Sequence, residues 1–458
     1  MLLCLLLAKV SVQIITLFGW YTPMNVIVPD AHGDWFNQRD DSFSHFMRMD
    51  GKKTKEVAIF KDYSLGVNTN RDAWVYNSNR QTVINSTKRS VLAFNKALGE
   101  LNSVLDTSSV RQKYIKDVAW SSSLVSRLER KIPSDFSERR IQKSLYRPFF
   151  KQNLYFDPES GFTHRPGRWK YIFPDSKAKN LAICSSGVGS KEYSCLMVDH
   201  IPCLDFLEKT QCFPRWLPGE QTKGAEDTLD FGEPSEMPSG FSQEALPHFQ
   251  AAYPGKPITE DDLFYYIYGI LHSEDYRTRY ANNLMKELPR IPRVATYEQF
   301  MAFVEAGQEL ARLHVHFEDV APYAGVKIEY TKVGQPSYRV TQMKWGKIKG
   351  KTGNAAKDKT TLIYNDWITV KNIPLEAQEY VVNKKSALDW VVERACVSID
   401  KASGIVNDFN DYAAEMGSER YPLDLFLKVI TVSLETMKIV KALPKLEIHQ
   451  LDKEASVD

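Results

Sequence analysis

The stretch YRPFFKQNLYFDPESGFTHRPGRWKYIF, from Tyr146 to Phe173, decides the fold class that the sequence predicts. Short aromatic runs alternate in it with Pro, Gly, Asn and Asp, which is typical of strands joined by turns. The same alternation of aromatic runs with turn-forming residues extends from Phe136 to about Trp216. We therefore expect a β-rich region in the middle of the chain.

Further strands are predicted toward the C-terminus. Apolar and polar residues alternate in VKIEYTKV (326–333), and strands are also expected at SYRVTQMKW (337–345) and TLIYNDWITV (361–370). The segment GKIKGKTGNAAKDKT (346–360), rich in Lys and Gly, is expected to form a hairpin loop between the last two strands.

Helices are predicted on both sides of these strands. Residues 85–130 have apolar residues at helical spacing, and Asn85 or Ser86 can cap their start. Thr259 and Asp262 form a capping box in front of another apolar stripe. Further helices are expected at 300–313, 387–395 and 423–442.

This order of elements predicts an α+β fold rather than a doubly wound parallel one. It consists of a helical spacer, a mixed or antiparallel β-rich region with inserted helices, and a helical C-terminal part. With 458 residues, 43% of them hydrophobic and 12% aromatic, the chain can form two or three globular units.

Charge is nearly balanced over the whole chain, at a formal +2, but it is segregated along the sequence. Residues 139–191 hold eleven Lys and Arg against three Asp and Glu, and residues 327–359 hold nine against two. Residues 219–262 hold ten acidic and two basic residues. This pattern is typical of a protein with one basic face that binds phosphates, although each run could equally be a solvated loop.

The motifs of common catalytic sites are absent from the sequence. We find no nucleotide-binding phosphate loop, no nucleophile elbow, no His-Glu-x-x-His metal motif and no D/N-P-P-Y/F tetrapeptide of amino-methyltransferases. SSGVGSK (185–191) is either a phosphate-cradling turn or a tight turn between strands. The sequence therefore predicts no catalytic residue.

The cysteines are scattered along the sequence, and we interpret them as reduced residues of the core. Cys195, His200, Cys203 and Cys212 lie in one region, but their spacing matches no common zinc site, so no metal ligand is predicted.

The first residues resemble a short signal peptide or anchor, because Met1 to Trp20 are almost entirely apolar. No basic residue precedes this run, however, and Lys9 interrupts it. No other stretch reaches the ~20 apolar residues that a membrane span needs. We therefore expect a cytoplasmic protein without a membrane partner.

Basic residues interleaved with aromatic ones are the strongest binding signal, because Lys and Arg neutralise phosphates and Arg also reads guanine edges. The aromatic residues themselves fit a core better than a stacking surface. The candidate DNA-binding residues are Arg139, Arg140, Lys143, Arg147, Lys151, Arg165, Arg168, Lys170, Lys191, Arg339, Lys344, Lys347 and Lys349.

Six blocks, in this order, carry a family resemblance. They are GDWFNQRDDSF (33–43), YSLGVNTNRDAWVYN (63–77), YRPFFKQNLYFD (146–157), ICSSGVGSKEYSCLMVDHIPCLDFLEKTQCFP (183–214), EDDLFYYIYGILHSEDYRTRYANNLMKELPRIP (260–292) and ALDWVVERACVSIDKASGIVND (387–408). Together they resemble the C-terminal specificity region of Type ISP restriction-modification enzymes over about residues 24–445.

The resemblance implies a function in DNA recognition. In that family one polypeptide carries a nuclease, an ATP-dependent motor, an N6-adenine methyltransferase and a target-recognition domain. S-adenosylmethionine, ATP and Mg²⁺ would belong to the domains that this chain lacks, so no cofactor is expected here. The target-recognition domains of the family differ from member to member because their DNA targets differ. No base-contacting residue can therefore be assigned to this chain from the resemblance.

The resemblance also suggests a division of the chain. We expect an atypical segment at 1–23, a remnant joining the missing methyltransferase at 24–77, a helical spacer at 78–133, a target-recognition region at 134–375 with inserted helices at about 259–316, and a C-terminal helical region and tail at 376–458. The partner is expected to be double-stranded DNA, with or without a separately encoded methyltransferase and helicase part. The alternatives are the specificity half of a split N6-adenine methyltransferase and an inactive remnant.

Overall fold

The computed structural model describes residues 27–51, 56–101, 106–175, 177–217, 238–349 and 355–453. Helices combine with several small, mostly antiparallel sheets, so the predicted α+β class is confirmed. The atypical segment 1–23 and most of the acidic stretch, residues 219–237, lie outside the described residues.

Short elements near the N-terminus complete sheets whose other strands come much later in the chain. These elements are η1 (Asp41–His45), β1 (Met47–Arg48), β2 (Ser64–Leu65), α2 (Asp72–Val75) and β3 (Tyr76–Asn77). Strand β1 pairs with β10 (Arg290–Ile291), β2 with β9 (Gln211–Pro214), and β3 with β5 (Phe150–Tyr155). The segment expected to join a methyltransferase thus contributes strands to three sheets of this fold.

Three helices form the region expected to be a spacer. They are α3 (Arg80–Leu101), α4 (Thr107–Lys113) and α5 (Ser122–Glu129). The predicted start was wrong, because Asn79 Oδ1 accepts a hydrogen bond from Thr82 N at 3.0 Å and so begins α3 before Asn85. Ser86, the other predicted cap, is buried and donates to Trp74 O at 2.7 Å.

The quoted aromatic stretch begins at the end of β4 (Ile141–Arg147) and contains β5, and these two strands form an antiparallel hairpin. The predicted strands and turns are thus confirmed in its first part, but Trp169–Ile172 near its end form a short helix. Arg147 pairs with Phe150, so Pro148 and Phe149 make the turn. Phe149 has a φ of 57°, which a bulky residue rarely adopts. Its ring packs edge-on against Phe317 and Tyr380, so tertiary packing stabilises the strained turn.

Two four-stranded sheets occupy the middle of the chain, in the orders β3-β5-β4-β8 and β2-β9-β6-β7. Their remaining elements, and the short helices between them, are η2 (Glu138–Arg140), α6 (Trp169–Ile172), β6 (Ala182–Ser185), β7 (Cys195–Val198) and β8 (Ile201–Pro202). Strand β4 pairs parallel with β8, whereas the other pairings are antiparallel.

The inserted helices are α7 (Ala245–Gln250), α8 (Glu260–His272), α9 (Glu274–Arg279), α10 (Ala281–Lys286) and α11 (Tyr297–Val315). The predicted capping box of Thr259 and Asp262 is confirmed at the start of α8. Helices α8 and α11 touch through glycines: a Cβ on Gly269 would lie 2.2 Å from Phe303 O, and one on Gly307 would lie 1.9 Å from Tyr265 O. The two backbones therefore approach each other as closely as glycine allows.

A third four-stranded sheet, in the order β11-β14-β13-β12, follows these helices. Its strands are β11 (Lys327–Tyr330), β12 (Lys344–Lys349), β13 (Ala355–Ile363) and β14 (Ile368–Lys371). The predicted loop at 346–360 was wrong, because most of it forms β12 and β13. Lys and Gly suggested a loop, but pairing between the two strands outweighs that local preference.

The C-terminal elements are η4 (Leu375–Gln378), β15 (Val381–Val382), β16 (Lys385–Ser386), α12 (Ala387–Arg394), β17 (Val397–Ile399), β18 (Val406–Asp408), α13 (Phe409–Glu415), α14 (Tyr421–Ala442) and α15 (Gln450–Lys453). Helices α12 and α14 confirm the predictions at 387–395 and 423–442.

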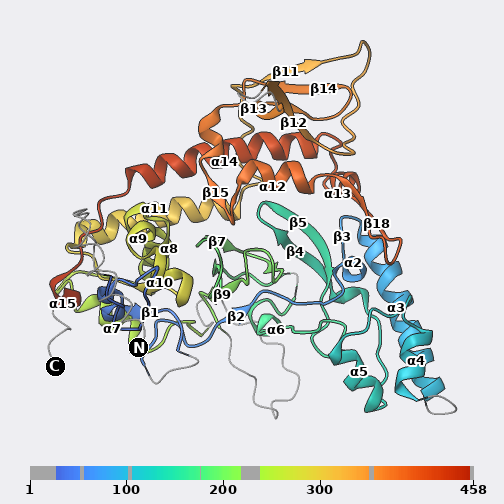
Figure 1. Cartoon of the computed structure of the whole chain (residues 1–458), viewed down its shortest axis with the longest axis horizontal. Coiled ribbons are helices and arrows are strands. Elements are labelled where there is room, and N and C mark those ends of the chain that lie inside the picture. The colour runs from blue at the N-terminus through green and yellow to red at the C-terminus, as the bar shows by residue number, and fades with distance from the viewer. Residues whose placement is uncertain are drawn as a thin grey trace, which may run out of the picture.

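Figure 1 shows how these layers are arranged. The long helix α14 crosses the molecule, the β11–β14 sheet stands above it, and α3, α4 and α5 lie on the opposite side of the molecule from that sheet. One hydrophobic core contains residues from the spacer, the central sheets and the C-terminal helices, and a second core surrounds α8 and α11. Among the described residues, no helix has the length and apolar composition that crossing a membrane requires.

Candidate nucleic-acid interface

Many of the predicted DNA-binding residues already have a carboxylate partner within the protein. The ion pairs are Arg140 with Asp157 (3.0 Å), Lys143 with Glu415 (2.6 Å), Lys151 with Glu318 (2.7 Å), Arg168 with Asp62 (2.7 Å) and Arg339 with Asp408. The side chains of Lys151 and Glu318 are only 12% and 13% exposed. These cations could contact a phosphate only by sharing or losing an internal partner.

Arg147 is held by its own neighbourhood. Its Nη1 donates to Tyr146 O at 2.6 Å and to Cys203 Sγ at 3.4 Å, and its guanidinium lies 4.1 Å from the centre of the Tyr146 ring. These contacts give Arg147 a packing role within the protein, independent of any contact with DNA.

A second group of predicted residues carries positive charges that can contact a phosphate without breaking an internal ion pair. Within the described part of the chain, these residues are exposed and form no ion pair with a carboxylate. They are Arg139, Arg165, Lys170, Lys191, Lys344 and Lys347. Lys349 lies in β12, and its side chain is outside the description.

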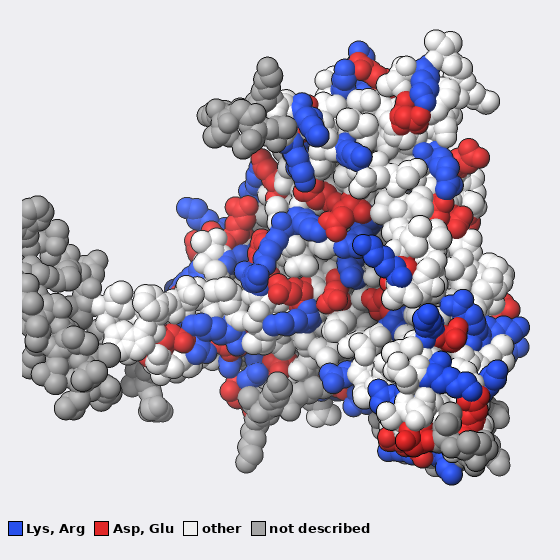
Figure 2. Space-filling view, turned by 45° about the vertical axis from the view of Figure 1, so that its right-hand side comes forward, with Lys and Arg blue, Asp and Glu red and all other residues white. Residues whose placement is uncertain are grey.

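The distribution of charge explains this division. Figure 2 shows Lys and Arg interspersed with Asp and Glu over the face it presents, so this face is not uniformly basic. The carboxylates that neutralise basic β-strands, such as Glu318 and Glu415, come from distant parts of the sequence. Counting charges along a local stretch therefore overestimated the free positive charge.

The SSGVGSK segment is a tight turn between β6 and β7, which was one of its two predicted roles. Its backbone donors are occupied: Gly187 N donates to Glu208 O at 2.9 Å and Gly189 N to Met285 O at 2.8 Å. A Cβ on Gly187 would lie 2.4 Å from Lys209 O. Glycine is needed here for close packing, and the turn does not fit a nucleotide phosphate.

The cysteines and histidines of the central region do not converge on one point. Cys184 and Cys212 face each other across β6 and β9 with their sulfurs 3.1 Å apart, whereas Cys195 Sγ accepts a hydrogen bond from Arg277 at 3.3 Å. No group of three or more metal-ligating side chains occurs among the residues that the structure describes.

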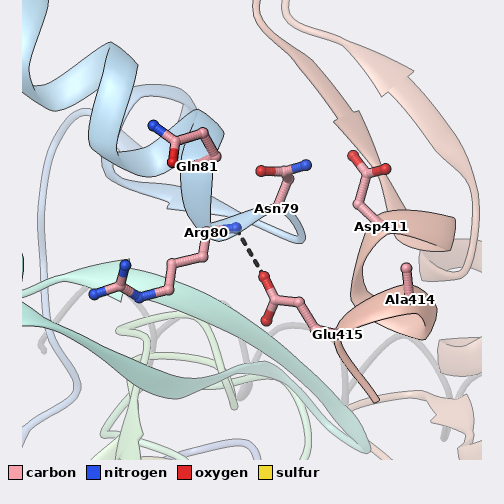
Figure 3. Close-up of a pocket in the computed structure, with 6 residues that line it drawn as sticks. All are labelled: Asn79, Arg80, Gln81, Asp411, Ala414 and Glu415. Atoms are coloured by element: carbon pink, nitrogen blue, oxygen red, sulfur yellow. Dashed lines mark hydrogen bonds between the residues drawn. The ribbon is translucent and has the colours of Figure 1, made fainter. Parts of the chain in front are cut away.

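A polar pocket of about 460 Å³ lies between the start of α3 and α13 (Figure 3). Glu415 points into it and accepts a hydrogen bond from Arg80 N at 2.8 Å. A helix N-terminus attracts anions, and here the protein's own carboxylate satisfies it. This pocket therefore suits an internal contact better than a phosphate.

A second pocket, of about 240 Å³, lies between α5 and the segment 158–166. Arg127 and Arg130 line it, but Arg127 donates to the backbone carbonyls of Glu159 and Pro133. Its guanidinium therefore serves to hold the surrounding loop.

The sequence prediction did not include Lys357, which is exposed on β13 directly opposite Lys347 on β12. Lys347 and Lys349 of the same segment were named, but the pairing of Lys347 with Lys357 could not be expected because residues 346–360 were predicted to form a loop. Thr360 and Thr361, which follow Lys357, favour a strand and could have indicated one.

Comparison with known proteins identifies the family. A model of the Type ISP C-terminal specificity domain matches residues 58–425. A nuclease-deletion mutant of the Type ISP enzyme LlaGI, in complex with a DNA substrate mimic, is 32% identical with a TM-score of 0.75, over 93% of this chain and 36% of that one. The ATP-dependent Type ISP enzyme LlaBIII bound to DNA is 32% identical with a TM-score of 0.78, over 92% and 26%.

A DrdV–DNA complex is also similar, at 29% identity and a TM-score of 0.76, over 93% of this chain and 41% of that chain. No curated protein matches the chain. This chain spans less than half the length of each of the three solved proteins. The protein belongs to the family of Type ISP C-terminal specificity domains.

Proposed function

We propose that this chain recognises a specific sequence in double-stranded DNA for a Type ISP restriction-modification system. The observation that carries the proposal is its similarity, over more than nine-tenths of its length, to two Type ISP enzymes solved with DNA or a DNA mimic. The exposed, unneutralised cations on η2, on β12 and in the loops after β5 are suited to phosphate contacts.

Methyl transfer, ATP hydrolysis and DNA cleavage would need parts beyond residues 27–453, in the same polypeptide or in a separately encoded partner. S-adenosylmethionine, ATP and Mg²⁺ would bind there. In support, the backbone donors of Gly187 and Gly189, in the Gly-rich turn between β6 and β7, are engaged by Glu208 O and Met285 O.

Selection of bound DNA from a random duplex pool tests the proposal directly. We expect repeated selection with the full chain to enrich one asymmetric motif. The bound fraction should fall steeply between about 50 and 200 mM salt, because Lys and Arg release counterions when they bind phosphates. Enrichment of no motif would contradict sequence recognition, and salt-independent retention would contradict phosphate binding.

A further inference from the structure

We infer that the two-stranded part of the β12–β13 hairpin formed by residues 346–349 and 355–358 is a DNA-binding ribbon, in which Lys347 and Lys357 contact the phosphate backbone. This inference rests on the proposed function and names the surface that performs it.

The hairpin extends beyond the sheet to which it belongs. Strand β14 pairs with β13 only at Leu362 and Ile363. Beyond the register shift after Trp345, β12 and β13 pair only with each other, from Gly346 opposite Asp358 to Lys349 opposite Ala355. This part is therefore a two-stranded ribbon, and a ribbon of that kind fits the major groove of B-DNA.

Two positive charges face each other across this ribbon. Lys347 is the direct partner of Lys357 in the antiparallel register, and both are exposed. Directly opposed side chains have Cβ atoms about 4.5–5.5 Å apart, and like charges in such a pair destabilise a sheet. The free protein therefore keeps an unfavourable pair that an anion between or beside the two ammonium groups would relieve.

Other carboxylates on this sheet and around it already form ion pairs with lysines. Glu329 pairs with Lys327 and Lys371, Asp366 with Lys332, and Asp389 with Lys359. The remaining acid of the ribbon, Asp358, accepts hydrogen bonds from the backbone and hydroxyl of Thr360.

Asp358 also follows Lys357 directly in the strand, so the Asp358 side chain points to the opposite face of the ribbon. In the described part of the chain no acid neutralises Lys347 or Lys357, whereas Lys327, Lys359 and Lys371 of the same sheet each have a carboxylate partner.

This arrangement distinguishes the ribbon from a merely solvated charged loop. A loop selected only for solubility would mix signs across the strands, as Lys327, Glu329 and Lys371 do in the neighbouring pair. The β12–β13 ribbon instead sets Lys347 directly opposite Lys357, without a carboxylate paired to either ammonium group in the described residues. A continuous polyanion is the partner that this chemistry fits, and duplex DNA supplies one.

The inference predicts opposite effects on binding and on stability. Lys347→Gln or Lys357→Gln removes a phosphate contact and also relieves the repulsion. We expect each variant to lower affinity for every duplex roughly fivefold to tenfold near 0.1 M salt, and to reduce the slope of log affinity against log salt by about 1. The melting temperature should be equal to or above that of the parent at low salt.

The experiment uses the full chain and a fluorescently labelled duplex of random sequence, titrated at several salt concentrations. Lys332→Gln is the matched control, because Lys332 follows β11 of the same sheet and Asp366 already neutralises it. It should retain the parent's affinity and slope. Lys357→Arg keeps the charge and should also behave like the parent, which separates loss of charge from damage to the hairpin.

If the parent binds with strong salt dependence while both Gln variants match it, the ribbon inference is overturned and the proposed function stands. If Lys357→Arg loses binding as Lys357→Gln does, the charge is not what matters and the inference is overturned. If the parent binds polyglutamate as tightly as duplex DNA, the ribbon is a site for an acidic protein and the inference is overturned. If the parent binds no duplex, both proposals fall together.

Discussion

Lys143 Nζ lies 2.6 Å from Glu415 Oε2, although 272 positions separate the two residues. The same carboxylate accepts hydrogen bonds from Arg80 N at 2.8 Å and from Asn153 Nδ2 at 3.0 Å. One side chain of α13 thus joins the start of α3 to the β4–β5 hairpin. Partial burial opposes ionisation of Glu415, but the hydrogen bonds from Lys143 and from Arg80 N outweigh it and lower its pKa.

Glu415→Ala should therefore destabilise the fold. Removing the carboxylate leaves Lys143 and Arg80 N without this acceptor, while Asn153 keeps only Ser78 O, and we expect the free energy of unfolding to fall by about 1–3 kcal/mol. Urea denaturation followed by circular dichroism measures this. Glu419→Ala is the control, because Glu419 is exposed and has no ion pair in the described structure. Equal midpoints for the two variants would show that the Glu415 contacts add nothing.

Lys151 and Lys170, both predicted to bind DNA, should respond differently to replacement by alanine. Lys151→Ala leaves Glu318, which is 13% exposed, without its cation, so the free energy of unfolding should fall by about 1–3 kcal/mol with an unchanged salt slope of DNA binding.

Lys170 is exposed, so Lys170→Ala should change stability by less than about 0.5 kcal/mol and reduce DNA affinity. Thermal melts and salt titrations of both variants test this. A reduced slope for Lys151→Ala would mean that its ion pair opens on DNA.

The contact between α8 and α11 makes Gly307 sensitive to a single methyl group. Gly307→Ala should lower the free energy of unfolding by roughly 2–4 kcal/mol, because the added Cβ meets the Tyr265 carbonyl and the helices must separate. Gly99→Ala provides the comparison, since a Cβ there meets nothing within 4 Å. In helix α3 this second change should stabilise by about 0.5–1 kcal/mol. Two variants of equal stability would argue against the close approach.

Buried histidines should make the protein less stable as the pH falls. Burial, with a contribution from the Arg277 charge, lowers the pKa of His314 to about 3, and burial lowers that of His272 well below its ordinary value. The unfolded chain takes up protons at these residues below about pH 6.5, while the folded protein does not. Their stabilising contribution is therefore complete above that pH and is lost as the pH falls toward the folded pKa values.

Each such imidazole can add up to about 1.4 kcal/mol per pH unit to the slope of stability against pH. His314→Gln should reduce this slope between about pH 6 and pH 4, measured by urea denaturation at each pH. His316→Gln is the control, because that side chain is 57% exposed. A slope that is the same in both variants would contradict a neutral His314 in the folded protein.

Several local features could be predicted from the sequence alone. The capping box of Thr259 and Asp262, the helices α12 and α14, and the strands in the first part of the quoted aromatic stretch all follow from interactions between residues a few positions apart. Turn chemistry, capping and periodic burial are local, so they leave a readable pattern. The absence of catalytic motifs and the family resemblance were likewise properties of the sequence itself.

Tertiary structure decided which cations remain free. Lys143 and Lys347 look alike in a count of charge, but Glu415 neutralises the first from 272 positions away, while the register of β12 and β13 sets the second against Lys357. The same holds for Phe149, whose turn depends on packing against Phe317. Coulombic and packing interactions act through space, and a sequence records only the order of residues along the chain, so these relationships exist only once the chain has folded.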